Sequence, residues 1–324
     1  MLPRMFRYSS SVWGHAMSES RLRVATRKSA LAVAQTTLVA TALGVPYELV
    51  SMTTEGDRRL DKSLASFGGK GVFIKELEVA LLEGRADIAV HSLKDMPAEV
   101  LPEFKLAAVL KREDPRDAFI AKGGACGINF MNLPAGARVG TGSIRRVVQL
   151  KALRPDLEYV PIRGNIQTRL SKLDELDGVV LAAAGLKRMG LSDQVTEFFS
   201  IEQVLPASGQ GILAIETLAE VPPCIDDVLS RVNHAETYAI AVAEMAFLKA
   251  LNAGCQFPVA SFAEFVDGPE SARILKIRGI YWDEPSKRLL RAERQCLISF
   301  DSATYMEQSR MAGVDLAREI RKSI

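Results

Sequence analysis

Apolar and polar residues follow one another along much of the chain in a pattern that predicts alternating strands and helices. Short apolar stretches such as RLRVAT (21–26) and DIAV (87–90) have the length and the branched residues of buried strands. Between them, SALAVAQTTLVATAL (29–43) and VFIKELEVALLEG (72–84) have apolar residues at helical spacing, and a glycine ends each of them. Strands that alternate with helices are typical of α/β proteins, whose mostly parallel sheets are covered on both faces.

A second series of strands and helices begins near Asp117 and predicts a further α/β domain. Its strands are expected at DAFIA (117–121), ARVG (137–140), LEYVPI (157–162) and GVVLAAA (178–184), and its helices at SIRRVVQLKAL (143–153) and NIQTRLSKL (165–173). The segment 122–136 contains several glycines and a proline and is interpreted as a surface insertion. The turn-rich stretch LPASGQGILAIE (205–216) ends in an apolar strand that is expected to return to the first domain.

The pattern changes near Asn233, where a long helix with apolar residues on most faces begins. Three strand-like segments follow, at 257–265, 273–282 and 288–300, and then a terminal helix from about Ser302. Strands followed by a helix indicate an α+β domain. No internal repeat and no low-complexity tract is evident.

These patterns predict an α/β protein of three domains, since a chain of 324 residues exceeds the ~100–200 residues of a typical single core. The expected division is an N-terminal extension (1–20), a first domain (21–112 and 210–231), a second domain (113–209) and a third domain (232–324).

Composition and charge exclude several classes of function. Hydrophobic residues make up 48% of the chain and charged residues 25%, as in ordinary soluble globular proteins. A net charge of +2 does not favour general binding to nucleic acid, so an anion site must come from local clustering of arginines. No apolar run approaches the ~18 residues of a membrane span, so no membrane partner is expected.

The cysteines and the N-terminal segment bear on the compartment. Cys126, Cys224, Cys255 and Cys296 are far apart and lack C-x-x-C spacing, so neither a metal site nor a disulfide framework is expected. Residues 1–20 are rich in serine and have no acidic residue before Glu19, which is compatible with a plastid or mitochondrial transit peptide. A disordered extension of a cytoplasmic protein, or a start site misplaced upstream of Met17, is the favoured alternative.

The stretch HSLKD (91–95) places titratable groups at the end of a predicted strand, where open parallel sheets bind their ligands. Asp95 could stabilise a cationic intermediate or move a proton there. It could equally cap the turn before Pro97, paired with Lys94. His91 is interpreted as a structural histidine rather than a catalyst.

Several arginines share a position at or just beyond the carboxyl end of a predicted strand. They are Arg27, Arg145, Arg146, Arg163 and Arg169. Guanidinium groups bind carboxylates through paired hydrogen bonds, and helix N-termini add backbone donors. The set therefore favours a ligand with several carboxylates or phosphates.

Two loops contain residues that could bind or hold a ligand. The GGKG stretch (68–71) is too short for a phosphate-binding loop of the Walker type, and it is interpreted as a hinge that brings Lys70 to an anion. Cys255 lies in LNAGCQFPV, where its thiol could be buried packing or could hold a group covalently.

Taken together, several stretches of the sequence resemble the hydroxymethylbilane synthase (porphobilinogen deaminase) family, closely over about residues 22–265. The stretches are RVATRKSALA, GGKGVFIKELEVALLEGRADIAVHSLKDMP, REDPRDAF, GTGSIRR, IRGNIQTRLSKLD, LAAAGLKRMG, GQG and GCQFPVA. The resemblance implies two domains like those of periplasmic binding proteins, with mixed, mostly parallel sheets, and a smaller α+β C-terminal domain. It also implies a monomer that condenses four porphobilinogen molecules into 1-hydroxymethylbilane and releases ammonia at each step.

The resemblance assigns roles to individual residues. Asp95 matches the catalytic aspartate, and Cys255 matches the cysteine that holds a dipyrromethane cofactor through a thioether. The other matches to cofactor-binding residues are Lys94, Thr141, Ser143, Arg145, Arg146, Arg163 and Gln210. The matches to substrate-binding residues are Arg27, Ser29, Arg169, Lys70 and Phe73, the last two on a loop over the site.

The chain departs from the family pattern at four positions. Gly142 replaces a usual serine, Met245 a common arginine and Ala253 a usual glycine, and Leu218 stands where an arginine is often found. These changes predict a weaker cofactor hydrogen bond, a lost carboxylate contact and a stiffer cysteine loop in an enzyme that is still active. The alternatives are a non-catalytic anion- or solute-binding module and a homologue that binds tetrapyrrole precursors without turnover.

Overall fold

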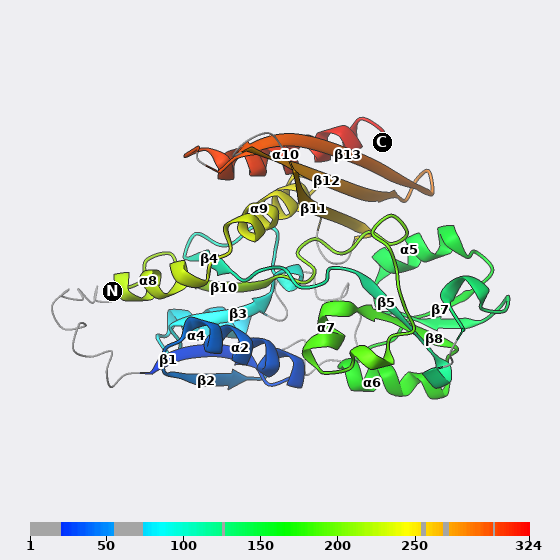
Figure 1. Cartoon of the computed structure of the whole chain (residues 1–324), viewed down its shortest axis with the longest axis horizontal. Helices are drawn as coiled ribbons and strands as arrows, with labels where there is room; N and C mark the ends of the chain where they lie inside the picture. The colour runs from blue at the N-terminus through cyan, green and yellow to red at the C-terminus, as the bar shows by residue number, and fades with distance from the viewer. Residues whose placement is uncertain (1–20, 55–73, 125–126, 254–256, 268–271, 301) are drawn as a thin grey trace.

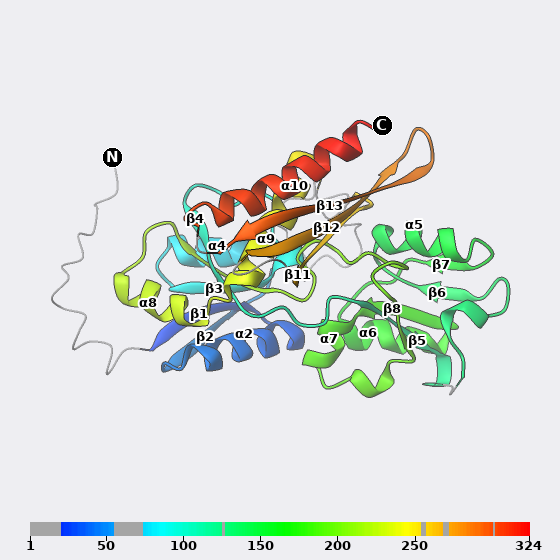
Figure 2. The same cartoon turned by 45° about the horizontal axis from the view of Figure 1, so that its top comes forward.

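The computed structural model describes residues 21–54, 74–124, 127–253, 257–267, 272–300 and 302–324, and within them it has three β-sheets. Two five-stranded sheets lie side by side, and a three-stranded sheet with its helices forms a layer against them (Figures 1 and 2). The α/β class predicted from the sequence is confirmed.

The first sheet has the strand order β2-β1-β3-β10-β4. Its strands are β1 (Leu22–Arg27), β2 (Tyr47–Met52), β3 (Ile88–Ser92), β4 (Phe104–Val109) and β10 (Leu213–Leu218). Its helices are α2 (Ala30–Leu43), α4 (Lys75–Leu82) and α8 (Pro223–Val232). The strand β10 pairs antiparallel with both β3 and β4, whereas β1 pairs parallel with β2 and β3. The late strand therefore returns to the first sheet, as its turn-rich approach predicted.

The second sheet has the order β7-β6-β8-β5-β9, and here β5 runs against its neighbours. Its strands are β5 (Asp117–Ala121), β6 (Arg138–Gly140), β7 (Glu158–Val160), β8 (Gly178–Ala182) and β9 (Glu197–Phe198). Its helices are α5 (Ile144–Leu153), α6 (Ile166–Leu170) and α7 (Ala183–Arg188). Part of the expected surface insertion is buried instead: Phe130 is fully enclosed, with its ring 5.8 Å from that of Phe119 and 5.2 Å from that of Phe199.

The third sheet is an antiparallel meander covered by two long helices on one face. It consists of α9 (Ala235–Ala250), β11 (Val259–Asp267), β12 (Ala272–Asp283), β13 (Arg288–Ser299) and α10 (Tyr305–Arg321). Gly313 lets α9 and α10 cross closely, because a Cβ atom there would lie 2.0 Å from the carbonyl oxygen of Ala243. The helix α9 packs against α10, β11 and β4, which explains why its apolar residues are not confined to one face.

A buried ion pair ties this layer to the segments that run between the two larger sheets. Arg112 follows β4 and donates to the carboxylate of Glu244 in α9 at 2.7 Å. The same carboxylate accepts hydrogen bonds from the backbone N–H groups of Gly209 (2.5 Å) and Ala263 (2.7 Å). Because Gly209 lies on the segment that leads back to β10, one carboxylate fixes both connecting segments relative to the third sheet.

No helix of the described segments is long and apolar enough to cross a membrane. Those segments also contain no group of His, Cys, Asp and Glu side chains arranged to hold a metal ion.

Candidate active site

Asp95 lies on a tight turn directly after β3. Residues Leu93–Asp95 form one 3₁₀ turn, closed by the N–H of Met96 donating to the carbonyl of Leu93 at 3.0 Å. The turn is anchored because Leu93 is buried and its N–H donates to the carbonyl of Ile212 beside β10. Asp95 itself is half-buried. The strand thus ends by presenting a carboxylate at the edge of the first sheet.

His91 lies on β3, before this turn. Its Nε2 atom is 3.0 Å from Oε2 of Glu216 on the neighbouring strand β10, and both side chains are buried. This pairing agrees with the structural interpretation of His91, because a buried polar side chain needs such a partner.

Lys94 lies beside the Asp95 carboxylate and near the arginines of the second sheet. Burial lowers the pKa of Lys94 to about 8. The negative charge of Asp95 opposes this shift, and the positive charge of Arg146 adds to it. Its ammonium group donates a long hydrogen bond of 3.4 Å to Oε1 of Gln210. Lys94 is therefore charged below about pH 8 and can lose a proton above it.

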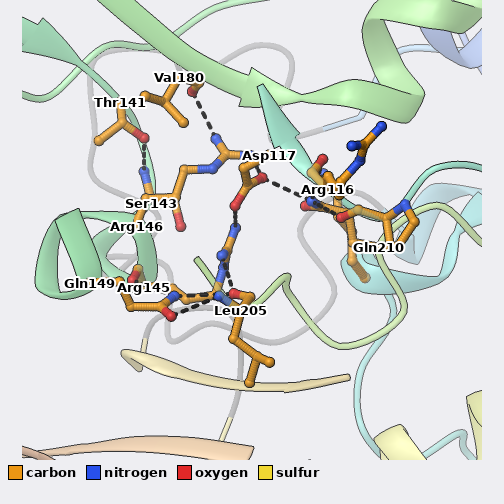
Figure 3. A network of polar contacts seen from close by, with 12 residues as sticks. Arg116, Asp117, Thr141, Ser143, Arg145, Arg146, Gln149, Val180, Leu205 and Gln210 are labelled. Atoms are coloured by element: carbon orange, nitrogen blue, oxygen red, sulfur yellow. Dashed lines mark hydrogen bonds and ion pairs between the residues drawn. The ribbon is translucent and has the colours of Figure 1, made fainter. Parts of the chain in front are cut away.

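Arg145 and Arg146 occupy the first turn of α5, and both are buried at 4% and 5% exposure. Each donates to a different oxygen of Asp117, Arg145 at 2.8 Å and Arg146 at 2.7 Å (Figure 3). Although burial alone would raise it, the pKa of Asp117 is held far below its usual range by these two guanidinium groups. The two arginines and Asp117 form a fixed ionic cluster with one excess positive charge.

Both arginines keep an unused donor. Arg145 also donates to the carbonyl of Leu205 at 2.5 Å, and Arg146 to that of Val180 at 3.0 Å. Their Nε atoms are buried and have no hydrogen-bond partner among the described residues. Buried donors are rarely left without a partner in a working structure. The cluster therefore has two donors available for an acceptor that is not part of the described protein.

Gln210 contacts groups at both sheet edges, and Figure 3 shows its contact with Asp117. Its Nε2 atom donates to Oδ1 of Asp117 at 2.8 Å and to the carbonyl of Pro115 at 2.7 Å, while its Oε1 atom accepts from Lys94. Lys94 belongs to the first sheet and Asp117 begins the second. A continuous polar path therefore joins the Lys94–Asp95 turn to the arginine pair.

Thr141 and Ser143 precede α5. Thr141 is buried at 2% exposure and accepts a hydrogen bond of 3.4 Å from the N–H of Ser143. Ser143 occupies the N-cap position of α5, but its side chain makes no capping hydrogen bond. Its hydroxyl group is therefore not used in holding the helix.

Arg163 and Arg169 lie on the turn between β7 and α6 and on α6 itself. Arg169 donates from Nε to the carbonyl of Gly164 at 2.8 Å, and Arg163 is exposed. Burial lowers the pKa of Arg169, and the charge of Arg146 lowers it further while Asp95 opposes the change. Arg169 is therefore electrostatically coupled to Arg146 and to Asp95.

On the first sheet, Arg27 ends β1 and Ser29 caps α2. The hydroxyl oxygen of Ser29 accepts from the N–H of Ala32 at 3.3 Å, so Ser29 has a structural role here. Nearby, Gln35 is buried at 6% exposure and its Oε1 atom accepts from Ser92 at 3.2 Å. Gln35 was not among the predicted site residues, although it is the only amide side chain on this helix of small, apolar and threonine residues.

Three predicted residues cannot be placed. Lys70, Phe73 and Cys255 lie outside the described residues. The sequence also gave no role to Asp117, whose signal was an acidic residue at the first position of a buried strand.

The four residues that depart from the family pattern differ in burial and in what they contact. Gly142 is exposed, and a Cβ atom there would lie 2.6 Å from the carbonyl oxygen of Ile162. Met245 is half-buried and packs against the core of the third sheet, where Ala253 is also buried. Leu218, at the end of β10, packs against a core cluster of the first sheet.

Comparison with known proteins identifies the relatives of this chain. Residues 22–224 match the family "Porphobilinogen deaminase, dipyromethane cofactor binding domain", and residues 238–322 match "Porphobilinogen deaminase, C-terminal domain". A porphobilinogen deaminase of Syntrophus aciditrophicus is 47% identical over 279 residues, covering 84% of this chain and 88% of that protein. One of Sorangium cellulosum is 44% identical over 310 residues, covering 94% of this chain and 99% of that protein.

Among solved structures, a periplasmic binding protein of Salmonella typhimurium has a TM-score of 0.37 at 13% identity, over 66% of this chain and 92% of that one. The family matches cover both larger sheets and the third sheet, and the identity extends over most of the chain. This chain belongs to the porphobilinogen deaminase family.

Proposed function

We propose that this chain is a working hydroxymethylbilane synthase with the active site described above. The reaction joins four porphobilinogen molecules head to tail, releases one ammonia at each step and ends in hydrolysis to 1-hydroxymethylbilane. Family membership supports this transferase activity, and the match to the dipyrromethane cofactor-binding domain supports the cofactor. A non-catalytic anion-binding module is disfavoured, because the family match extends through the C-terminal domain.

One observation supports the proposed site most directly. The polar path through Gln210 and Asp117 joins a reactive turn, Lys94–Asp95, to a buried pair of arginines with unused donors. Every pyrrole unit of this chemistry has an acetate and a propionate group, and guanidinium donors bind carboxylates well. The residues present therefore fit a dipyrromethane group, held by Lys94, Thr141, Ser143, Arg145, Arg146, Arg163 and Gln210.

When bound, dipyrromethane would supply the primer pyrrole to which the first substrate is joined. Asp95 then acts on the substrate: as porphobilinogen loses ammonia, the C–N bond breaks and positive charge develops on the pyrrole nitrogen. A fixed carboxylate next to that nitrogen lowers the barrier, since a preorganised charge stabilises charge that develops in the transition state. Arg27, Ser29 and Arg169 would bind the carboxylates of the incoming substrate.

Cys255 is proposed as the attachment point, and Lys70 and Phe73 as part of a loop over the site. Replacing Cys255 by serine should prevent stable thioether attachment, because a hydroxyl oxygen is a far weaker nucleophile than a thiolate. The intact mass of the purified variant checks this. A normal cofactor-bearing mass in Cys255→Ser would contradict the assignment.

The activity is tested by incubating the purified full chain with porphobilinogen and following ammonia release. An intact mass that includes the dipyrromethane adduct, with a positive acid Ehrlich reaction, should accompany turnover. A chain that shows neither added mass nor ammonia release would overturn the proposed function.

We further propose that the enzyme is a cytoplasmic monomer with no nucleic-acid or membrane partner, divided at the boundaries expected from the sequence. The net charge of +2 supports the absence of a nucleic-acid partner. The mass measurement also reports whether residues 1–20 have been removed, and light scattering during size-exclusion chromatography reports the oligomeric state.

A further inference from the structure

Asp117 is fully buried, and it lies where the two larger sheets meet. It begins β5, and its side chain has no exposed surface. Its carboxylate accepts hydrogen bonds from Arg145, Arg146 and Gln210 at 2.7–2.8 Å. A buried charge is costly unless it is paired and hydrogen-bonded, so such an arrangement constrains all of the partners.

The geometry around Asp117 determines which donors of the two guanidinium groups stay available. Each arginine is held at two points, by one Asp117 oxygen and by one backbone carbonyl, that of Leu205 or Val180. Each guanidinium has five N–H groups and uses one on each Nη, so its remaining donors include the buried Nε–H. A planar guanidinium held at two of its nitrogens cannot rotate, so the directions of its remaining donors are fixed as well.

Asp117 also sets the charge of this site. Two guanidinium groups face one carboxylate, so one positive charge remains for ligand carboxylates. Without Asp117, the two arginines would repel each other at close range and lose their common anchor.

We propose that Asp117 is a positioning residue for polycarboxylate pyrrole ligands: it holds Arg145 and Arg146 so that their remaining Nε–H donors face ligand carboxylates. The proposal rests on the proposed function, because the ligand class follows from it. Asp117 acts through the arginines and does not touch the reacting atoms. Its effect should therefore appear in cofactor loading and in substrate KM.

The test compares Asp117→Asn with Asp156→Asn in the purified full chain. Asp156 is a matched control, because its exposed carboxylate also accepts two guanidinium hydrogen bonds, from Arg154 at 2.8 and 2.6 Å, just beyond the other end of α5. An asparagine at 117 keeps the shape but can accept from only one arginine and turns its NH₂ group toward donors. Intact mass gives the fraction of chains with cofactor, and kinetics of the loaded fraction give KM and kcat separately.

The Asp117→Asn variant should show a clear fall in the cofactor-bearing fraction and a rise in porphobilinogen KM of about 10- to 100-fold, typical for loss of a buried charged partner. The kcat of the loaded fraction should change far less, and Asp156→Asn should match the wild type in all three measurements. If Asp117→Asn matched Asp156→Asn while the wild type turned over, the positioning role would be wrong and the proposed function would stand. A wild type without turnover would instead overturn the proposed function.

A fold defect could imitate loss of loading, so a second variant keeps the charge. Asp117→Glu moves the carboxylate by one methylene, about 1.5 Å, without removing its pairing partner. With native circular dichroism, it should still show the raised KM. A double-mutant cycle with Arg145→Lys adds a further criterion, since a residue that acts through Arg145 gives non-additive effects on KM. Additive effects, or a normal KM in a folded Asp117→Glu, would overturn the proposal.

Discussion

The first and second sheets can be compared directly, because their strand orders correspond. In the order β2-β1-β3-β10-β4, the strand next to the far edge runs against the others, and in β7-β6-β8-β5-β9 the strand β5 does the same. Their ligand edges differ in construction, however. The first presents Asp95 on a single 3₁₀ turn, whereas the second presents Arg145 and Arg146 on a ten-residue helix.

The difference lies in how many bonds hold the functional groups. Asp95 is half-buried and makes no hydrogen bond through its carboxylate to another described residue. The arginine pair is buried and held by Asp117 and two backbone carbonyls. One edge therefore offers a reactive group at little structural cost, while the other is part of the core. Substitutions at the first edge should therefore lower activity alone, and substitutions at the second edge should lower both activity and stability.

The largest effect is expected at the first edge. Asp95→Asn should lower turnover by roughly 10²–10⁴-fold, because the developing pyrrole cation loses its counter-charge. Unfolding free energy should change by less than about 1 kcal/mol, since Asp95 is half-buried and no hydrogen bond of its carboxylate to a described residue is lost. Ammonia release from the cofactor-bearing variant and urea denaturation measure the two quantities. Retained turnover would refute the catalytic role.

At the second edge, a substitution should cost stability as well as activity. Arg145→Gln leaves Asp117 with one guanidinium partner, and breaking a buried ion pair costs about 3 kcal/mol or more of unfolding free energy. The exposed pair Arg318–Asp315, at 2.9 Å within α10, gives a control, because Arg318→Gln should cost less than about 0.5 kcal/mol. Equal denaturation midpoints for the two variants would contradict the contrast between the sheets.

The strands and helices were readable from the sequence, but the site was only partly so. Periodicity gives the elements, and strand ends give the edge at which Asp95 and the arginines gather. The partners of those residues could not be derived, because they come from distant parts of the chain: Gln210 bonds to Asp117 across 93 positions, and Arg146 bonds to Val180 across 34. Such pairings follow from the relative placement of two sheets, which local patterns do not encode.

The same reason explains the error at Phe130. Phe130 lies in a segment with the composition of a loop, yet its ring fills the core of the second sheet. Phe130 is therefore placed by packing against distant residues and not by local composition. The helix α8, residues 223–232, is a different case: it was not among the predicted helices, although Pro223 in its first turn and the apolar residues Ile225, Val228, Leu229 and Val232 at helical spacing were a local signal.

A smaller effect tests how tightly the second edge is packed. Gly142→Ser should lower the unfolding free energy by about 1–3 kcal/mol, because the new Cβ would approach the backbone carbonyl of Ile162 at 2.6 Å and force a shift. Gly185→Ala is the control, since its Cβ would meet only the ends of flexible side chains, Ile166 at 3.3 Å and Leu31 at 3.8 Å. If both variants unfolded at the same denaturant concentration, the close approach of Gly142 to Ile162 would not restrict which side chains fit at this position.

The smallest effect concerns Lys94, which couples the two edges through Gln210. The pKa of Lys94 is about 8 in the folded chain, against a usual value of 10.5, because burial disfavours its charge. As the pH rises through about 8, Lys94 loses its charge, so porphobilinogen KM should rise several-fold. In Lys94→Arg, whose side chain stays charged, the part of the rise that is due to Lys94 should disappear.

The free energy of unfolding should increase over the same pH range in which binding of porphobilinogen weakens. The unfolded chain binds more protons at Lys94 than the folded chain between about pH 8 and 10.5, so this residue makes the fold more stable as the pH increases across that window. Urea denaturation at several pH values would show this as a rise in the free energy of unfolding of the wild type relative to Lys94→Met, which cannot titrate.

The outcome that would contradict the KM prediction is a pH profile of KM that is the same in the wild type and in Lys94→Arg. It would show that the two edges bind carboxylates without the help of the Lys94 ammonium group.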